Sequence, residues 1–296
     1  YSVTSLSGRI IPQKGDIGHN ARMTIHIDTS LPIGVFDSGV GGLTVLKAIR
    51  ETLPNENLVY LGDTARLPYG TKSPASIERY AIQATTKLRE YNIKMLVVAC
   101  NTASAVAIVA LQQHMAPIPV IGVVDPGAEA AVAAGAGDSY LVLATEATVR
   151  LGAYSRAIKM RDLGAEVREQ SCEMLVSLAE EGWTSGHIAD SIVRQYLAEA
   201  EDNTFKADSI ILGCTHFPLL RDTISSIAGD VVVVDSATTT AAVVRETLMS
   251  HGGLIVSKQP GMLKLLATDG IQRFARVGGQ FLGQPLTVEN IQLVDL

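Results

Sequence analysis

The amino-acid sequence predicts an α/β fold with two pseudo-symmetric lobes, each built on a mainly parallel sheet flanked by helices. Short apolar, β-branched runs alternate with longer segments of helical spacing along most of the chain, which is the pattern of βαβ units. Most of these apolar runs lack strict alternation with polar residues, as expected for strands covered on both faces. A third observation is that one layout of strands and loops occurs twice.

The repeated layout lies in the order of the elements, because sequence identity between the two halves is slight. The matching positions, in chain order, are Asp37, Tyr69 and Cys100 in the first half and Thr145, Glu180 and Cys214 in the second. Open parallel sheets bind ligands at the carboxyl ends of their strands. Two such lobes that face each other therefore predict an active site in the cleft between them.

Each predicted strand is a short apolar run, and most are followed by a segment long enough for a helix. The predicted strands are Ile33–Phe36, Leu58–Leu61, Met95–Ala99, Val120–Val124, Leu141–Ala144, Ala165–Arg168, Ile210–Leu212 and Val231–Val234. The predicted helices are Gly42–Thr52, Pro74–Tyr91, Ala103–His114, Thr148–Leu163, Ser185–Ala200 and Pro218–Ile227. Asn101 and Thr102 are suitable caps for the third helix, and Pro218 suits the first turn of the last.

The chain of 296 residues is long enough for about two domains. A charged fraction of 18%, a net charge of -6 and the absence of a basic cluster interleaved with aromatics disfavour nucleic acid as a partner. No apolar segment reaches the roughly 20 residues that span a bilayer, and the N-terminus lacks the signal-peptide pattern. Three widely spaced cysteines do not suggest a disulfide framework. We therefore expect a cytoplasmic protein with no membrane partner.

The predicted domain organisation follows from these patterns. Residues 1–30 have no sustained periodicity and begin without methionine, so we expect a peripheral leader or an expression-derived extension. Residues 31–127 together with 237–296 are predicted to form the first lobe, and residues 128–236 the second.

Two of the three cysteines occupy similar positions. Cys100 follows the apolar run "KMLVVA", and Cys214 follows "SIIL" and a glycine. Each precedes a predicted helix, where unsatisfied N–H groups and the helix dipole favour a thiolate. The alternative is that both are buried small hydrophobes, the usual fate of a free cysteine. Their matching positions favour a shared chemical role, whereas Cys172 has no such neighbours and is interpreted as structural.

The stretch "IGVFDSGVGGLTVLKAI" (Ile33–Ile49) reads as strand, polar loop and helix. It is not a phosphate loop, because no Lys-Ser/Thr pair follows its glycines, and it lacks the third glycine of the dinucleotide fingerprint. Its glycines would let backbone N–H groups approach a small anion. Asp37 and Ser38 are placed to contact substrate; the alternative is a tight turn with a capping aspartate.

Two further polar positions are candidates. His216 lies two residues after Cys214, but no second Cys/His pair has ligand spacing, so we expect no metal site. A histidine beside a thiol serves as a proton partner or as a cation that stabilises thiolate, unless it is simply a satisfied loop residue. Glu180 would be an ordinary solvated helix residue were it not for the repeat, which matches it with Tyr69.

Taken together, five motifs resemble the glutamate racemase family, within the aspartate/glutamate racemase superfamily. The motifs are "VFDSGVGGL" (Val35–Leu43), "LPYGTKS" (Leu67–Ser73), "VACNTAS" (Val98–Ser104), "LATEATVRLGAY" (Leu143–Tyr154) and "GCTHFPLL" (Gly213–Leu220). The resemblance implies two similar α/β lobes around one site, and a cofactor-independent reaction with neither pyridoxal phosphate nor metal. One cysteine thiolate removes the α-proton of glutamate, and the other cysteine, as a thiol, protonates the opposite face.

The resemblance also implies roles for individual residues. Cys100 should act on D-glutamate and Cys214 on L-glutamate, assisted by Asp37, His216 and Glu180. The implied substrate contacts are Asp37, Ser38, Tyr69, Gly70, Asn101, Thr102, Thr145, Thr148, Thr215 and His216. The D-glutamate formed would supply peptidoglycan synthesis, and the expected assembly is a homodimer.

Three alternatives remain open at the level of sequence. A racemase for aspartate or another small acid would differ in substrate profile. A cysteine hydrolase built on Cys214, His216 and an acid would leave Cys100 without a role. A non-catalytic binding protein would keep its function when either cysteine is replaced.

Overall fold

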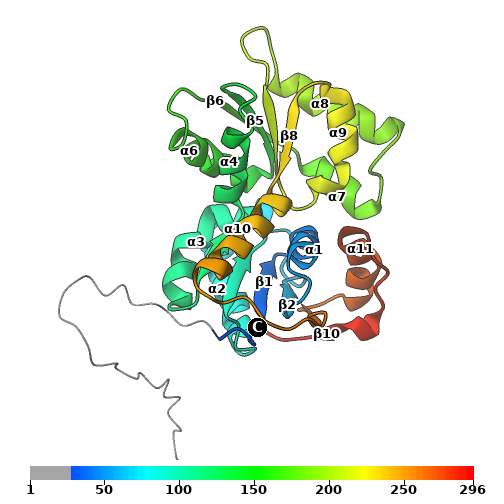
Figure 1. The fold of residues 1–296 in the computed structure, drawn as a ribbon. Helices are drawn as coiled ribbons and strands as arrows, with labels where there is room; N and C mark the ends of the chain where they lie inside the picture. Colours follow the sequence, from blue (N-terminus) through cyan, green and yellow to red (C-terminus); the bar gives the residue numbers. More distant parts are fainter. Residues whose placement is uncertain (1–27) are drawn as a thin grey trace, which may run out of the picture.

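The structure is a computed structural model in which residues 28–296 are described. The predicted N-terminal extension, residues 1–30, therefore lies outside the described residues except at its end. The described chain forms two sheets, one in each half of the molecule in Figure 1, and every strand pair in them is parallel. This confirms the predicted α/β class with two parallel sheets flanked by helices.

The first sheet has six strands in the order β10-β9-β2-β1-β3-β4. Its strands are β1 (Ile33–Asp37), β2 (Leu58–Gly62), β3 (Met95–Val98), β4 (Val120–Gly122), β9 (Leu263–Ala267) and β10 (Ile291–Leu293). Every residue of β1, β2 and β3 is buried. Helices cover both faces of these central strands, which explains why their sequences are continuously apolar.

The second sheet has four strands in the order β6-β5-β7-β8. Its strands are β5 (Ser139–Ala144), β6 (Glu166–Ser171), β7 (Ser209–Gly213) and β8 (Val232–Asp235). In both sheets the first strand lies between the second and the third, and the fourth lies outside the third. The layout that the sequence repeats is therefore present as a repeated strand order.

The helices that pack on the sheets are mostly α-helices. They are α1 (Leu43–Thr52), α2 (Pro74–Arg89), α3 (Asn101–Met115), α4 (Val124–Ala133), α5 (Glu146–Leu151), α6 (Ala153–Lys159), α7 (Glu173–Glu181), α8 (His187–Ala200), α9 (Arg221–Ala228), α10 (Ser236–Ser250) and α11 (Ile271–Leu282). Short 3₁₀ helices are η1 (Tyr69–Thr71), η2 (Phe217–Leu220) and η3 (Val288–Asn290). None of the helices within residues 28–296 is long and apolar enough to cross a membrane.

Two predicted helices are wrong in their extent. The segment predicted as one helix over 148–163 is two helices, because Gly152 takes a left-handed conformation with φ of 58° and ends α5. The helix predicted from Pro218 begins as η2 and continues as α9. No residue range was predicted for α4, α7, α10, α11, β9 and β10, although Glu180 was expected near the end of a helix. Helix α10 is rich in threonine, a poor helix former, and begins where the Asp235 carboxylate accepts the N–H groups of Ala237 and Thr238.

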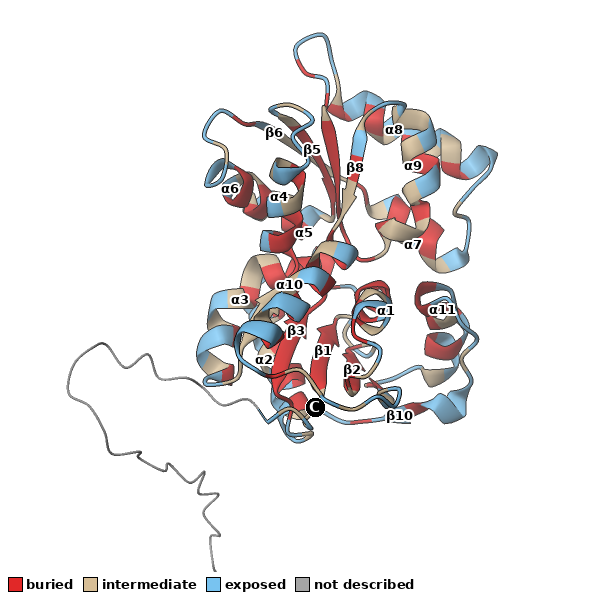
Figure 2. Cartoon of the chain, viewed as in Figure 1, coloured by how far each residue is buried: buried red, intermediate tan, exposed pale blue. Residues whose placement is uncertain are grey.

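The apolar interior is continuous between the two halves of the molecule. One buried cluster includes Leu43 and Val123 from the first half and Leu212 and Phe217 from the second. Figure 2 shows buried residues along the strands of both sheets and at the helices between them. The predicted division into lobes at residues 127/128 and 236/237 stays a prediction; residue 128 lies within α4.

A buried ion pair stabilises the first lobe. The Lys94 ammonium donates to Glu56 at 2.6 Å and to the carbonyls of Thr29 and Gly253 at 2.9 Å, and both charged side chains are almost fully buried. The other Glu56 oxygen accepts the N–H of Ile255. The pair links the residue before β3 to the segment between α1 and β2. Through the carbonyl of Gly253 and the N–H of Ile255, it also holds the segment that follows α10.

Replacing Lys94 with methionine is expected to lower the free energy of unfolding by about 3 to 5 kcal/mol, because Glu56 would be left buried without its counter-charge. Urea denaturation followed by circular dichroism measures this change. Lys87→Met is the matched control: Lys87 pairs with Glu90 on the surface of α2, and such pairs contribute little to stability. Equal stabilities of the two variants would contradict the prediction.

Candidate active site

A cavity of about 220 Å³ lies where the carboxyl ends of the two sheets face each other. Loops that follow β1, β3, β5 and β7 all contribute to its wall. Of the residues predicted from sequence, the cavity is lined by Ser38, Tyr69, Gly70, Cys100, Asn101, Thr102, Thr145, Glu180, Cys214, Thr215 and His216. Asp37 and Thr148 are the two predicted residues that do not line it.

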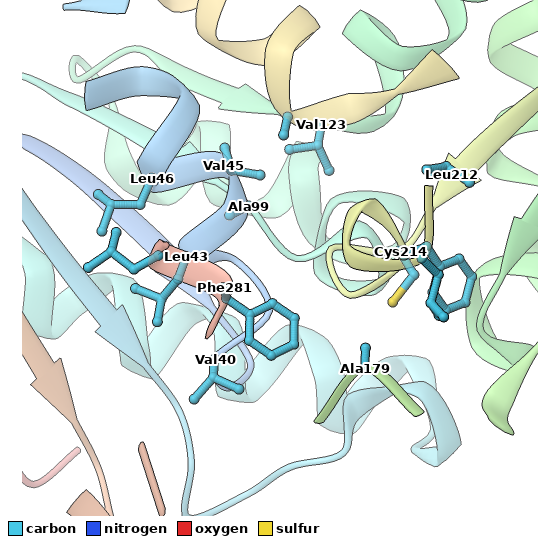
Figure 3. Close-up of a cluster of buried hydrophobic side chains, with 14 of the residues drawn as sticks. Val40, Leu43, Val45, Leu46, Ala99, Val123, Ala179, Leu212, Cys214 and Phe281 are labelled. Atoms are coloured by element: carbon cyan, nitrogen blue, oxygen red, sulfur yellow. The ribbon is translucent and has the colours of Figure 1, made fainter. Parts of the chain in front are cut away.

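Both predicted cysteines line this one cavity. Cys100 follows β3 and Cys214 follows β7, which are equivalent strands in the repeated order. The two thiols are similarly buried, at 5% and 6% exposure. Figure 3 shows Cys214 near Leu212 and Ala179, at the edge of the apolar cluster that reaches Phe281. The structure thus brings two thiols from opposite lobes to the same space.

Cys100 is a neutral thiol in this setting. It caps α3 and accepts the N–H of Ala103 at 3.4 Å, while its own S–H donates to Ser38 Oγ at 3.4 Å. These hydrogen bonds lower the pKa of the thiol, but burial and the nearby Asp37 carboxylate raise it more, so that the pKa of Cys100 is about 12. Burial therefore opposes the thiolate that the position at the helix terminus was expected to favour.

Cys214 has a different partner. Its Sγ lies 3.7 Å from His216 Nδ1, and the chain continues into the 3₁₀ helix η2 rather than into an α-helix. The predicted helix N-terminus is therefore absent at this position. The imidazole takes the place of the helix dipole as the positive group beside the thiol.

His216 is held on both sides of its ring. Its Nε2 lies 3.2 Å from Glu180 Oε1, and Phe281 packs edge-on against the ring with 5.0 Å between centroids. Although burial opposes the charged form, the hydrogen bonds to Cys214 and Glu180 raise the pKa of His216 to about 10. The imidazole is thus a cation at neutral pH, one of the two roles that the sequence left open.

Glu180 belongs to the last turn of α7, which ends at Gly182. Its hydrogen bond to His216 and, after it, the Arg273 guanidinium hold the pKa of this carboxyl down at about 2. The structure therefore excludes the reading of Glu180 as a solvated helix residue. It is an ionised carboxylate that lines the cavity.

Asp37 lies behind the cavity wall rather than on it. Its Oδ2 accepts the N–H of Gly39 at 2.8 Å and the hydroxyl of Tyr60 at 3.4 Å, and Oδ1 has no hydrogen-bond partner within residues 28–296. Burial raises the pKa of this carboxyl. Its charge acts on Cys100 and His216, so Asp37 influences both thiol environments from behind the cavity wall.

The glycine loop after β1 serves a contact between lobes. A Cβ at Gly41 would lie 2.3 Å from Thr215 Oγ1 and 2.4 Å from His216 Nδ1. Glycine at position 41 therefore lets this loop meet the His216 loop of the other lobe. The sequence predicted a role in anion approach for these glycines and did not foresee this contact.

Hydroxyl and amide groups form the rest of the polar wall. Thr102, Thr145 and Thr148 are mutually hydrogen-bonded across the two lobes at 2.9 to 3.3 Å. Asn101 donates to the Tyr154 hydroxyl at 2.7 Å, and its Oδ1 has no partner in the described part of the chain. Thr148, although buried away from the cavity, holds the two threonines that line it.

Sequence reasoning missed several residues of the wall. They are Gly39, Leu67, Pro68, Thr71, Glu173, Val176 and Ser177. Three of them belong to α7, for which no residue range was predicted. Asp63 accepts the hydrogen bond of the Tyr69 hydroxyl at 2.5 Å, and its position just after a predicted strand could have marked it as a candidate. Nothing in the sequence around Arg273 could have done so, because no helix or strand was predicted there.

The charges around the cavity are few. Among its lining residues within 28–296 there is no lysine or arginine. No group of three or more His, Cys, Asp or Glu side chains in the described chain has the geometry of a metal site. An anionic ligand in this cavity would be held by neutral donors and the His216 cation.

Residues 33–244 match the protein family described as Asp/Glu/Hydantoin racemase. A glutamate racemase of Geobacter metallireducens is 46% identical over 255 residues, covering 86% of this chain and 93% of the relative. A glutamate racemase of Neisseria meningitidis is 41% identical over 271 residues, covering 92% and 99%. Among solved structures, a glutamate racemase of Francisella tularensis in complex with D-glutamate has a TM-score of 0.83 at 36% identity, covering 90% of this chain and 98% of that one.

Proposed function

Because the chain belongs to the Asp/Glu/Hydantoin racemase family, we infer that it interconverts L- and D-glutamate, and we propose that Cys100 and Cys214 are its two proton-transfer groups. The D-glutamate serves peptidoglycan synthesis, as it does for the glutamate racemase family. The observation that carries the assignment of residues is that two buried thiols, one from each lobe, line one cavity.

The reaction requires removal of a proton from one face of the α-carbon and delivery of a proton to the other. In the L-to-D direction, the Cys214 thiolate takes the α-proton, and the electron pair stays on the substrate carbon. The Cys100 thiol then gives its proton to the opposite face. The products are D-glutamate, a Cys214 thiol and a Cys100 thiolate, and the return reaction or proton exchange with solvent restores the starting enzyme.

The protonation states favour this order. The neutral Cys100 thiol is ready to donate a proton, and the His216 cation beside Cys214 stabilises the thiolate that accepts one. Glu180 keeps the imidazole charged and oriented. Asp37 assists from behind, where its charge opposes a thiolate at Cys100 and attracts the His216 cation.

Glutamate is bound, in this proposal, by neutral hydrogen-bonding groups and by the His216 cation. The unpaired Asn101 Oδ1 is an acceptor available to the substrate ammonium group. The proposed contacts are Ser38, Tyr69, Gly70, Asn101, Thr102, Thr145, Thr215 and His216, with Asp37 and Thr148 acting through the residues that they hold. Pre-oriented dipoles of this kind stabilise the charge that develops at the α-carbon and its carboxylate.

We also propose a homodimer and a cytoplasmic location. Met174, Trp183 and Ile188 are large apolar side chains, each about half exposed, on and near α7 and α8, and a second copy would cover such a surface. Two thiols that must stay reduced suit a reducing compartment, and all three cysteines are free. Sedimentation velocity at micromolar concentration tests the dimer.

The function is tested by proton exchange in heavy water. Purified protein is incubated with L- or D-glutamate, deuterium at the α-carbon is followed by NMR, and optical activity by circular dichroism. We expect deuterium to enter both isomers while the optical activity decays to zero, with Cys172→Ala indistinguishable from wild type. Activity on aspartate but not on glutamate would replace this function by the related one, and absence of exchange from both would reject a racemase.

A further inference from the structure

Helix α11 contacts the second lobe at three points close to the active site. Arg273 donates from Nη2 to Glu180 Oε2 at 2.5 Å. Phe281 packs against the His216 ring, and Gln280 lies beside Gly182, where an added Cβ would be 3.1 Å from its side-chain oxygen. The helix itself packs on α1, between the first-lobe strands β9 and β10 in the chain. A first-lobe element thus reaches the groups that surround Cys214.

We propose that Arg273 is a positioning residue for the Cys214 half of the reaction, holding Glu180 so that it orients His216. This inference rests on the proposed function. Arg273 does not line the cavity that holds the thiols, so it acts through Glu180 and not on the substrate.

The argument starts from the two oxygens of the Glu180 carboxylate. Oε1 pairs with His216 Nε2, and Oε2 pairs with Arg273. With both oxygens engaged, the carboxylate plane is fixed and Oε1 points at the imidazole. Without the guanidinium, the carboxylate is free to rotate about its terminal torsion, which is intrinsically broad, and the imidazole loses its fixed partner.

The ion pair between Arg273 and Glu180 adds little to the free energy of unfolding. The Arg273 side chain is 51% exposed, and half-exposed ion pairs contribute little to folding. The geometric role remains, because the pair joins residues 93 positions apart and from different lobes. The Cys214 site is therefore completed only when α11 and α7 are in contact.

Within residues 28–296, Cys100 has no comparable hydrogen-bonding support from the other lobe. Its hydrogen-bond partners, Ser38 and the N–H of Ala103, both come from the first half of the chain. Loss of Arg273 should therefore slow proton transfer at Cys214 and leave transfer at Cys100 unchanged. This asymmetry separates positioning from a general loss of structure.

The experiment compares Arg273→Gln with Arg273→Lys and with Arg276→Gln in the full chain. Arg276 lies one turn along the same exposed side of α11 and makes no ion pair in the described chain, so its variant is the matched control. We expect Arg273→Gln to lower kcat about tenfold with KM changed less than about twofold. Arg273→Lys should recover most of the loss, and Arg276→Gln should match wild type.

Isotope effects on kcat/KM identify which thiol is affected. With substrate deuterated at the α-carbon, the L isomer reports proton removal at Cys214 and the D isomer reports removal at Cys100. In Arg273→Gln the effect should rise for the L isomer and fall for the D isomer. In a Glu180→Gln background, adding Arg273→Gln should change kcat little, since the group that it positions is already lost.

Each result has a defined meaning. An active wild-type enzyme whose Arg273→Gln variant keeps its kcat overturns the inference and leaves the proposed function intact. Isotope effects that change equally for the two isomers, or a loss of kcat that is fully additive with Glu180→Gln, also overturn it, because Arg273 would then not act through Glu180 on Cys214. A wild-type enzyme that does not racemise glutamate rejects the proposed function itself.

Discussion

Replacing Cys100 or Cys214 with alanine is expected to lower kcat for racemisation by about 10³-fold in both directions, within the range that proton-transfer groups contribute. Each direction uses one thiol to remove a proton and the other to return it, so neither direction survives the loss of either group. Circular dichroism of L- and D-glutamate solutions measures the rate of each variant.

Cys172→Ala is the matched control for these two variants. Cys172 is also buried and free, but it lies at the start of α7 outside the cavity lining. Thermal melts of all three variants separate loss of chemistry from loss of fold. Racemisation that persists in a folded Cys100→Ala variant would reject the two-thiol mechanism.

Replacing His216 with asparagine is expected to lower kcat/KM about 10²-fold at pH 7 and to change the dependence on pH. In the wild-type enzyme the pKa of His216 is raised to about 10, so the imidazolium is present throughout pH 7 to 9 and its contribution should be lost only as the pH rises through about 10. Asparagine carries no charge at any pH, so the activity of His216→Asn should lack this loss.

The ratio of wild-type to variant activity gives the cleanest measurement. Dividing the two profiles removes the titration of the substrate ammonium group, which both enzymes share. The ratio should stay constant between pH 7 and 9 and fall by up to about tenfold per pH unit above about pH 10, as expected for a single deprotonation of His216. A ratio that stays constant above about pH 10 would show that the charge of His216 does not contribute to the reaction.

The central strands and the two thiols could be predicted from sequence because their signals are local. Strands β1, β3, β5 and β7 are apolar runs, and each cysteine directly follows one of the runs. The motifs around Cys100 and Cys214 also carried the family resemblance. The predictions for these strands and cysteines depended only on residues that are neighbours in the sequence, so they did not require knowledge of contacts between distant segments.

The supporting contacts could not be predicted, since they join distant segments. Arg273 meets Glu180 across 93 positions, and Gly41 meets His216 only because the two loops face each other. Helices α4 and α11 contain glycine or proline, which weakens their sequence pattern, and tertiary packing decides them instead. Similarly, the raised pKa of Cys100 depends on burial, which the capping pattern alone did not reveal.

The repeated strand order has a stereochemical consequence. A single lobe carries one thiol after its third strand, so it offers a proton acceptor to one face of a carbon atom and can at most exchange that proton with retention of configuration. A second copy of the same lobe, turned to face the first, supplies the opposite face. The repeat of one lobe within a single chain therefore supplies both of the proton-transfer groups that inversion of configuration requires.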